Sequence, residues 1–195
     1  MISRLLVKKI LEQARSYEWS FQGLGMLRCY LSKEVRLHVW DPRLAFPGVS
    51  TRHTHPWNFR SQVIVGRLKD EVYDWGFSTK ELTATHHRQM IQCGPGGRAK
   101  GEIQDVRLNQ CDSRIVGDSY GGRGYQTGYS LSREAIHESI PEPGTVTIIE
   151  RQFGGDPDHA YVFWPYGTNW VSAEPRPATY GEIEGMTKTA LERFR

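Results

Sequence analysis

The sequence predicts an all-β fold, a barrel or sandwich with one helix at each end. Many short apolar or alternating segments in the middle of the chain are separated by turns rich in glycine and proline, which is typical of sandwiches and barrels. The two ends carry apolar residues at helical spacing instead. The 195 residues contain no long low-complexity linker, so we expect one domain over residues 1–195.

The terminal helices are expected over residues 2–16 and 180–194. The first segment is too highly charged for a secretory signal and has a helical apolar stripe. That stripe consists of Ile2, Leu5, Leu6, Ile10, Leu11 and Ala14. The second segment lies within "TYGEIEGMTKTALERFR", after the last predicted strand.

The barrel is expected over residues 26–165. Its predicted strands occupy 26–40, 61–75 with a turn near Gly66, 80–93, 129–140, 145–153 and 159–165. Residues 98–128 have the least regular pattern, and we expect an insertion over 94–128 with two short strands within 99–117. The segment 117–128 holds five glycines in twelve residues. Since ordering glycine costs much backbone entropy, we expect a mobile flap there, at the barrel mouth.

Composition narrows the class of protein. The net charge of +3 comes from basic residues dispersed among acids, which disfavours a dedicated nucleic-acid binder. The chain has no apolar run of about 18 residues, so no membrane span is expected. Three cysteines without a CxxC pair favour free thiols and a cytoplasmic location. We expect a small-molecule substrate as partner, and a homodimer is an open alternative.

Two histidines stand one residue apart in "STRHTHPWNFRSQVIVGRL", residues 50–68. On an extended backbone His53 and His55 point to the same face, because side chains alternate with a period of two. Two imidazoles on one face can share a metal ion, whereas a lone histidine in a strand is more often a packed, hydrogen-bonded side chain. A metal site therefore needs a third ligand.

His137 is the favoured third ligand, because a tight turn and a strongly apolar strand follow it. The alternatives are His86 and His87, which lie about twenty residues past Gly66. Three neutral imidazoles suit Fe(II), Ni(II), Cu(II) or Zn(II) and leave coordination positions open. The ligand types by themselves do not select one of these metals.

With these motifs the chain resembles the cupin superfamily of double-stranded β-helix proteins, over roughly residues 35–165. The first cupin motif has His-x-His, a glutamate ligand about four residues on, and then a glycine, of which His53, His55 and Gly66 are present here. The glutamate position falls on Phe59 or Arg60. The second motif, Pro-x-Gly-x-x-His, is represented by "SREAIH", which keeps only His137. The resemblance implies a cupin-like double-stranded β-helix barrel.

The missing glutamate leaves three histidines, and in this respect the chain is similar to the thiol dioxygenase branch, whose members hold mononuclear iron. The resemblance therefore implies Fe(II) as cofactor. Thiol dioxygenases carry Ser-x-His-x-Tyr in the strand after the third histidine. Here Thr147, Ile149 and Arg151 stand in those places, which argues against cysteine itself as the substrate.

Four further residues are candidates for the site. Arg36 and Trp57 are expected to bind substrate, the first by gripping a carboxylate or phosphate and the second by walling the pocket. Arg60, in place of the lost glutamate, and Tyr161, as a proton donor or orienter, are the catalytic candidates. Surface ion pairing of the arginines and core packing of the aromatic residues are the competing interpretations.

Together with this resemblance, the sequence predicts a mononuclear non-haem iron dioxygenase acting on a small polar or anionic molecule. A non-oxidative cupin, either an isomerase or a small-ligand sensor, is the first alternative. A metal-free barrel that serves as an interaction module is the second.

Overall fold

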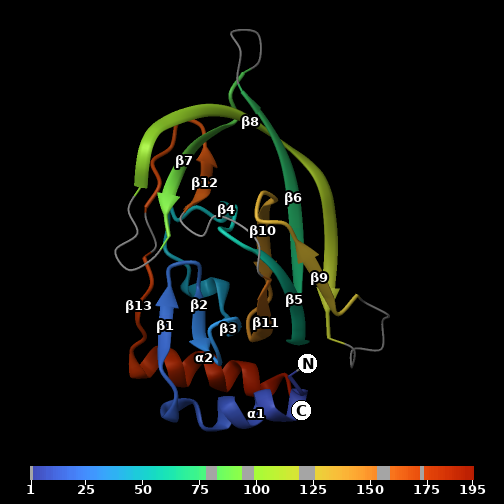
Figure 1. The fold of residues 1–195 in the computed structure, drawn as a ribbon. Coiled ribbons are helices and arrows are strands. Elements are labelled where there is room, and N and C mark those ends of the chain that lie inside the picture. Colours follow the sequence, from blue (N-terminus) through green and yellow to red (C-terminus); the bar gives the residue numbers. More distant parts are fainter. Residues whose placement is uncertain (1, 78–82, 94–98, 119–125, 153–158, 172–173) are drawn as a thin grey trace.

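The structure is a computed structural model that describes residues 2–77, 83–93, 99–118, 126–152, 159–171 and 174–195. The chain forms two antiparallel β-sheets, with one helix from each end of the chain packed below them (Figure 1). The predicted all-β class with terminal helices is confirmed. The helices lie side by side in Figure 1, and both chain ends are at that end of the molecule.

The first sheet has seven strands, in the order β13-β1-β2-β3-β11-β5-β9. Its strands are β1 (Trp19–Gln22), β2 (Met26–Tyr30), β3 (Val35–Trp40), β5 (Asn58–Val65), β9 (Gly128–Leu131), β11 (Thr145–Gln152) and β13 (Arg176–Pro177). Side chains of these strands alternate between a face toward the helices and a face toward the second sheet. The sequence did not predict β1, which is only four residues long.

The second sheet closes on itself in the order β10-β4-β12-β7-β8-β6. Its strands are β4 (Arg52–His53), β6 (Arg67–Phe77), β7 (His86–Gln92), β8 (Ala99–Gly117), β10 (Ile136–Pro141) and β12 (His159–Pro165). Pairing of β10 with both β4 and β6 closes this barrel. An apolar cluster contributed by four of its strands fills the interior, namely Tyr73, Val106, Leu108, Ile136 and Phe163.

The predicted insertion with two short strands within 99–117 was wrong, because β8 is a single strand of 19 residues. Its first part pairs with β7 and its second part with β6, with a register shift in each pairing. It arches over the top of the barrel (Figure 1). Most of its residues are exposed, so the sequence shows little apolar alternation there. Residues 119–125 of the predicted flap lie outside the described residues, and its mobility stays a prediction.

The N-terminal helix α1 spans Arg4–Glu12 and is followed by a single 3-10 turn, Ala14–Ser16. The Ser3 hydroxyl caps α1 by accepting a hydrogen bond from the amide of Leu6 at 3.2 Å. Two positions of the predicted apolar stripe were wrong, because Leu5 and Leu6 are exposed. Val7 is buried instead, and with Ile10, Leu11 and Ala14 it forms the face that meets the sheet.

The C-terminal helix α2 spans Tyr180–Glu192 and begins with a capping box. The hydroxyl of Thr179 accepts from the Glu182 amide, and the Glu182 carboxylate accepts from the Thr179 amide. Both helices cover the outer face of the seven-stranded sheet in one apolar cluster.

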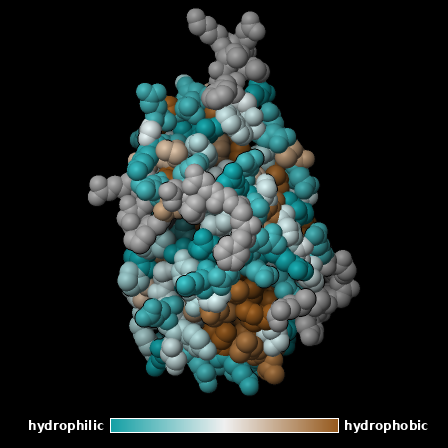
Figure 2. All heavy atoms as spheres, viewed as in Figure 1, coloured by the Kyte–Doolittle hydropathy of each residue, from teal (hydrophilic) through white to brown (hydrophobic). Residues whose placement is uncertain are grey.

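No described helix is long and apolar enough to cross a membrane. In Figure 2, apolar side chains gather low on the visible face, and hydrophilic side chains surround them.

A second apolar cluster lies between the two sheets and consists of Trp57, Phe59, Val63, Leu68, Val116, Tyr129, Leu131 and Ile149. Its members come from both sheets, so it holds the seven-stranded sheet against the closed barrel. This layer borders a cavity of about 830 Å³ between the sheets, which contains the candidate site.

Candidate metal centre

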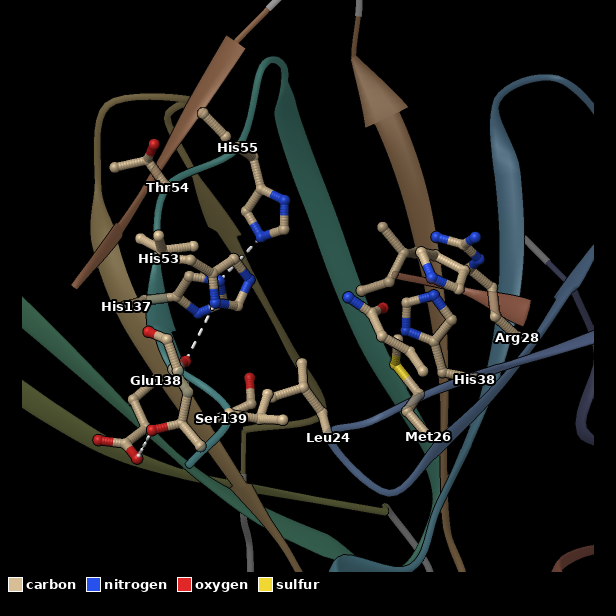
Figure 3. A pocket seen from close by; sticks show the side chains of 18 of the residues that line it. Leu24, Met26, Arg28, His38, His53, Thr54, His55, His137, Glu138 and Ser139 are labelled. Carbon is tan, nitrogen blue, oxygen red and sulfur yellow. Dashed lines mark hydrogen bonds between the residues drawn. The ribbon is translucent and has the colours of Figure 1, made fainter. Parts of the chain in front are cut away.

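Three histidines form a cluster on the outer face of the closed barrel, where that face borders the cavity. One ring nitrogen from each of His53, His55 and His137 lies within 4.8 Å of the others. His53 on β4 is the direct cross-strand partner of His137 on β10. Figure 3 shows the three rings together on one side of the cavity.

Strand alternation explains why these rings point into the cavity. Ile136, adjacent to His137, fills the barrel interior, so His137 faces outward. Val162 pairs with His53 across β12 and therefore shares its face. Beyond β4, Thr54 continues the pairing, since its amide donates to the carbonyl of Tyr161 at 2.9 Å. The backbone thus stays extended far enough to bring His55 to the same side as His53.

The hydrogen bonds of two of the rings fix their tautomers. The Nδ1 atom of His53 lies 3.0 Å from the carbonyl oxygen of Thr51, and that of His137 lies 2.9 Å from the Asp70 carboxylate. Both oxygens only accept, so each Nδ1 carries the proton. In the neutral form of each ring, Nε2 then carries the lone pair that could bind a metal ion. The Nε2 atoms of His55 and His137 face each other at 2.9 Å.

Burial keeps His53 and His55 neutral. Burial, together with the neighbouring His137, lowers the pKa of His53 from 6.5 to about 3. Burial also lowers the pKa of His55 well below its usual value, with smaller contributions from His53 and His137. Neutral imidazole is the form that binds a metal ion, so these two rings are in the ligating state at neutral pH.

Two aromatic side chains wall the cluster. The ring of Trp57 stacks on His55 with centroids 4.7 Å apart, and Phe59 meets His55 edge-on at the same distance. Phe59 is also 5.5 Å from the ring of His137. An apolar ring therefore occupies the place where the cupin pattern puts its glutamate ligand. Trp57 lines the cavity, and its contact with a substrate stays a prediction.

The structure does not bring Arg60 to the cluster. Arg60 is exposed on β5, while its neighbours Phe59 and Ser61 are buried and line the cavity. Because alternate residues of a strand point to opposite faces, an inward Phe59 places Arg60 outside. The catalytic role predicted for Arg60 has no geometric support.

The ring of Tyr161 also faces away from the histidines. Tyr161 borders the cavity, but its neighbour Val162 is the residue on the face of His53. The guanidinium of Arg88 lies 4.1 Å from the Tyr161 ring centroid, and the ring packs against the cluster inside the barrel. The proton-donor role predicted for Tyr161 is not supported by this orientation.

The two alternative third ligands lie elsewhere. His86 contacts Arg52 and Thr85 through its ring nitrogens, and Arg52 in turn pairs with Glu138. His87 pairs with Asp105 at 2.8 Å. Of the three candidates, only His137 joins the pair of histidines.

Several residues around the cavity were not predicted from the sequence. Asp70 on β6 bonds His137, and the buried Tyr129 lines the cavity next to Phe59. Arg28, His38 and Arg151 line the opposite wall together with the predicted Arg36. For Arg28, Arg36 and His38 the available signal was their alternation with buried apolar residues on β2 and β3, in "MLRCY" and "VRLHVW".

A three-histidine group able to hold a metal ion therefore lies in a cavity between two antiparallel β-sheets. Comparison with known protein families and with curated proteins finds no match to this chain.

Proposed function

We propose that the chain binds one divalent metal ion through His53, His55 and His137 and acts as a mononuclear non-haem iron dioxygenase on a small anionic molecule. The observation that carries this proposal is the orientation of the rings. Acceptor-only oxygens hold the Nδ1–H groups of His53 and His137, which leaves Nε2 of each ring as the ligand atom. One ring nitrogen of each of the three histidines lies within 4.8 Å of the others.

The donor set fits the metal. Three imidazoles are suitable ligands for Fe(II), Ni(II), Cu(II) or Zn(II), and three protein ligands leave positions open for other molecules. With Phe59 in place of a carboxylate, the ligand set resembles that of the thiol dioxygenase branch of the cupins, in which the metal is iron. Bound Fe(II) would supply the redox chemistry that lets dioxygen react with an organic substrate.

The chain's own residues would position the ligands and control access. Asp70 holds the ring of His137 and is itself paired with Arg114 at 3.2 Å. Such outer partners orient metal-binding histidines and increase their basicity. Trp57 and Phe59 cover His55 and keep water from that side of the cluster. The cavity volume of about 830 Å³ is in the range of small-molecule sites.

The test begins with metal content. Protein produced with ample iron, nickel, copper and zinc is analysed by elemental mass spectrometry, and oxygen uptake is then measured with panels of thiols and small organic acids. Stoichiometric iron with substrate-dependent oxygen uptake is the expected result.

Bound metal without oxygen uptake would contradict the dioxygenase and favour a non-oxidative cupin, an isomerase or a small-ligand sensor. Absence of stoichiometric metal under all loading conditions would overturn the metal centre itself. In that case the metal-free interaction module would be the better description.

A further inference from the structure

Four basic side chains form a wall of the cavity opposite the histidine cluster. This basic wall consists of Arg28 on β2, Arg36 and His38 on β3, and Arg151 on β11, all lining the cavity. Arg28 and His38 are direct cross-strand partners, so they share a face. Figure 3 shows Arg28 and His38 across the cavity from the three histidines.

The three guanidinium groups have no carboxylate partner among the residues that the structure describes. Arg28 donates to the Ser20 hydroxyl at 3.2 Å, and Arg151 donates to the Lys33 carbonyl at 3.5 Å. The Nε of Arg36 is buried and has no hydrogen-bond partner within this part of the chain. Burial, with repulsion from Arg28 and Arg151, lowers the pKa of Arg36 to about 10. Three positive charges are thus gathered without a neutralising anion.

Two acidic residues also line the cavity, and neither neutralises the wall. Glu138 is paired with Arg52, 2.9 Å away. Glu174 is exposed to solvent. The excess of positive charge at the wall is therefore open to a ligand.

His38 points to a ligand independently of the arginines. It is only 8% exposed, and neither ring nitrogen has a hydrogen-bond partner among the described residues. Burial, with Arg36 and Arg28 nearby, lowers the pKa of His38, so the ring is neutral and offers one donor. Buried polar atoms are normally hydrogen-bonded, so an unpaired ring facing a cavity indicates a missing partner.

We propose that the basic wall of Arg28, Arg36, His38 and Arg151 is a subsite for an oxyanion group with two negative charges, either a phosphate monoester or a dicarboxylate. Guanidinium groups bind such oxygens in bidentate fashion, and a dianion balances more of the three charges than a single carboxylate does. We take the bound molecule to be the substrate of the metal centre, and this part of the proposal rests on the proposed function.

The geometry links the subsite to the metal centre through one ring. Trp57 stacks on His55, and the guanidinium carbons of Arg36 and Arg151 each lie 5.0 Å from the Trp57 ring centroid. A single indole therefore separates the histidine cluster from two of the arginines. A ligand whose anionic group binds at the basic wall has to extend past Trp57 to reach the histidine cluster. A short molecule can span this distance.

The test is calorimetric titration of the whole protein, both metal-loaded and after chelator treatment, with inorganic phosphate, malonate and acetate. We expect phosphate or malonate to bind at least tenfold more tightly than acetate. Preference for phosphate assigns a phosphate monoester, preference for malonate a dicarboxylate, and equal binding a general dianion subsite. Arg36→Gln should weaken dianion binding by roughly tenfold, because a charge-assisted bidentate contact is lost.

Arg107→Gln is the matched control, since it removes the same charge from a β8 residue outside the cavity. It should leave dianion binding unchanged. Equal dianion binding by Arg36→Gln and the unaltered chain would overturn the subsite, as would the absence of dianion binding. Dianion binding that requires the metal and is unchanged by Arg36→Gln would show that the anion binds to the metal. That result would also overturn the subsite. Dianion binding by a protein that takes up no metal under any loading condition would support the subsite and contradict the proposed function.

A second measurement avoids substitutions altogether. The ring ¹⁵N resonances of His38 should shift on phosphate or malonate addition, because an unpaired nitrogen gains a partner. His159, which is outside the cavity lining, serves as the internal control. An unchanged His38 signal at saturating dianion would contradict the proposed subsite.

Discussion

The Nδ1 atom of His137 lies 2.9 Å from the Oδ1 atom of Asp70, and Asp70 is completely buried. Asp70 sits on β6 and His137 on β10, two neighbouring strands of the closed barrel. The contact holds the imidazole in the tautomer that presents Nε2 to the cavity. A buried carboxylate has to be compensated, and Arg114 does this from β8 at 3.2 Å.

Asp70→Asn should weaken metal binding by roughly tenfold, because the amide keeps the shape of the side chain but loses the charge that increases the basicity of His137. Competition with a chelator of known affinity measures the change. Asp112→Asn is the matched control, since Asp112 also approaches Arg114, at 3.6 Å, but is exposed. Equal affinities for the two variants would contradict a role of Asp70 in positioning the ligand.

His55→Ala and His137→Ala should each fold and lose most bound metal, because two imidazoles are too few for tight binding. His87→Ala should keep its metal, since His87 pairs with Asp105 outside the cluster. Elemental analysis of the purified variants, with circular dichroism as the folding check, measures this. Retention of stoichiometric metal by His137→Ala would show that the third ligand is another residue.

Gly66→Ala should lower the free energy of unfolding by at least about 1 kcal/mol. Gly66 has a φ of +82°, and a Cβ there would lie 2.9 Å from the Cα of Thr145. Gly76→Ala on β6 is the control, because a Cβ at that position meets no atom within 4 Å. Urea denaturation of both variants provides the comparison, and similar stabilities would contradict the tight approach at Gly66.

Stability at acid pH should depend on Glu182. Hydrogen bonds from Arg176, with further ones from Thr179, lower the pKa of Glu182 from 4.5 to about 2. Since the folded-state pKa is depressed, this contribution is complete above pH 4.5 and is lost as the pH falls toward 2. As the pH falls from 4.5 to about 2, the free energy of unfolding should therefore decrease less in Glu182→Gln than in the unaltered chain.

Glu184→Gln on the same helix is the control for this effect, because Glu184 is more exposed and its nearest cation, Arg15, is 3.7 Å away. It should retain the acid dependence of the unaltered chain. Parallel stability curves for Glu182→Gln and the unaltered chain, measured by urea denaturation from pH 5 to pH 2, would refute the role of Glu182.

Local patterns in the sequence predicted the β class, the terminal helices and the shared face of His53 and His55. Turn residues, helical spacing and strand alternation act over a few neighbouring positions, so they can be recognised without knowing the rest of the fold. Local patterns did not predict β8 as one strand, because its residues are mostly exposed and lack apolar alternation. Local patterns also left open which residue takes the place of the glutamate ligand. The alternation of side chains along the strand decides whether Phe59 or Arg60 faces inward.

Only the tertiary structure decided which distant residues meet. His137 rather than His86 or His87 joins His53 because β10 pairs with β4. Asp70 reaches His137 through the pairing of β6 with β10, although 67 positions separate them in the chain. The basic wall likewise exists because β2, β3 and β11 are neighbours in the sheet. Strand pairing between remote segments is set by burial of the whole apolar layer, which no short stretch of sequence contains.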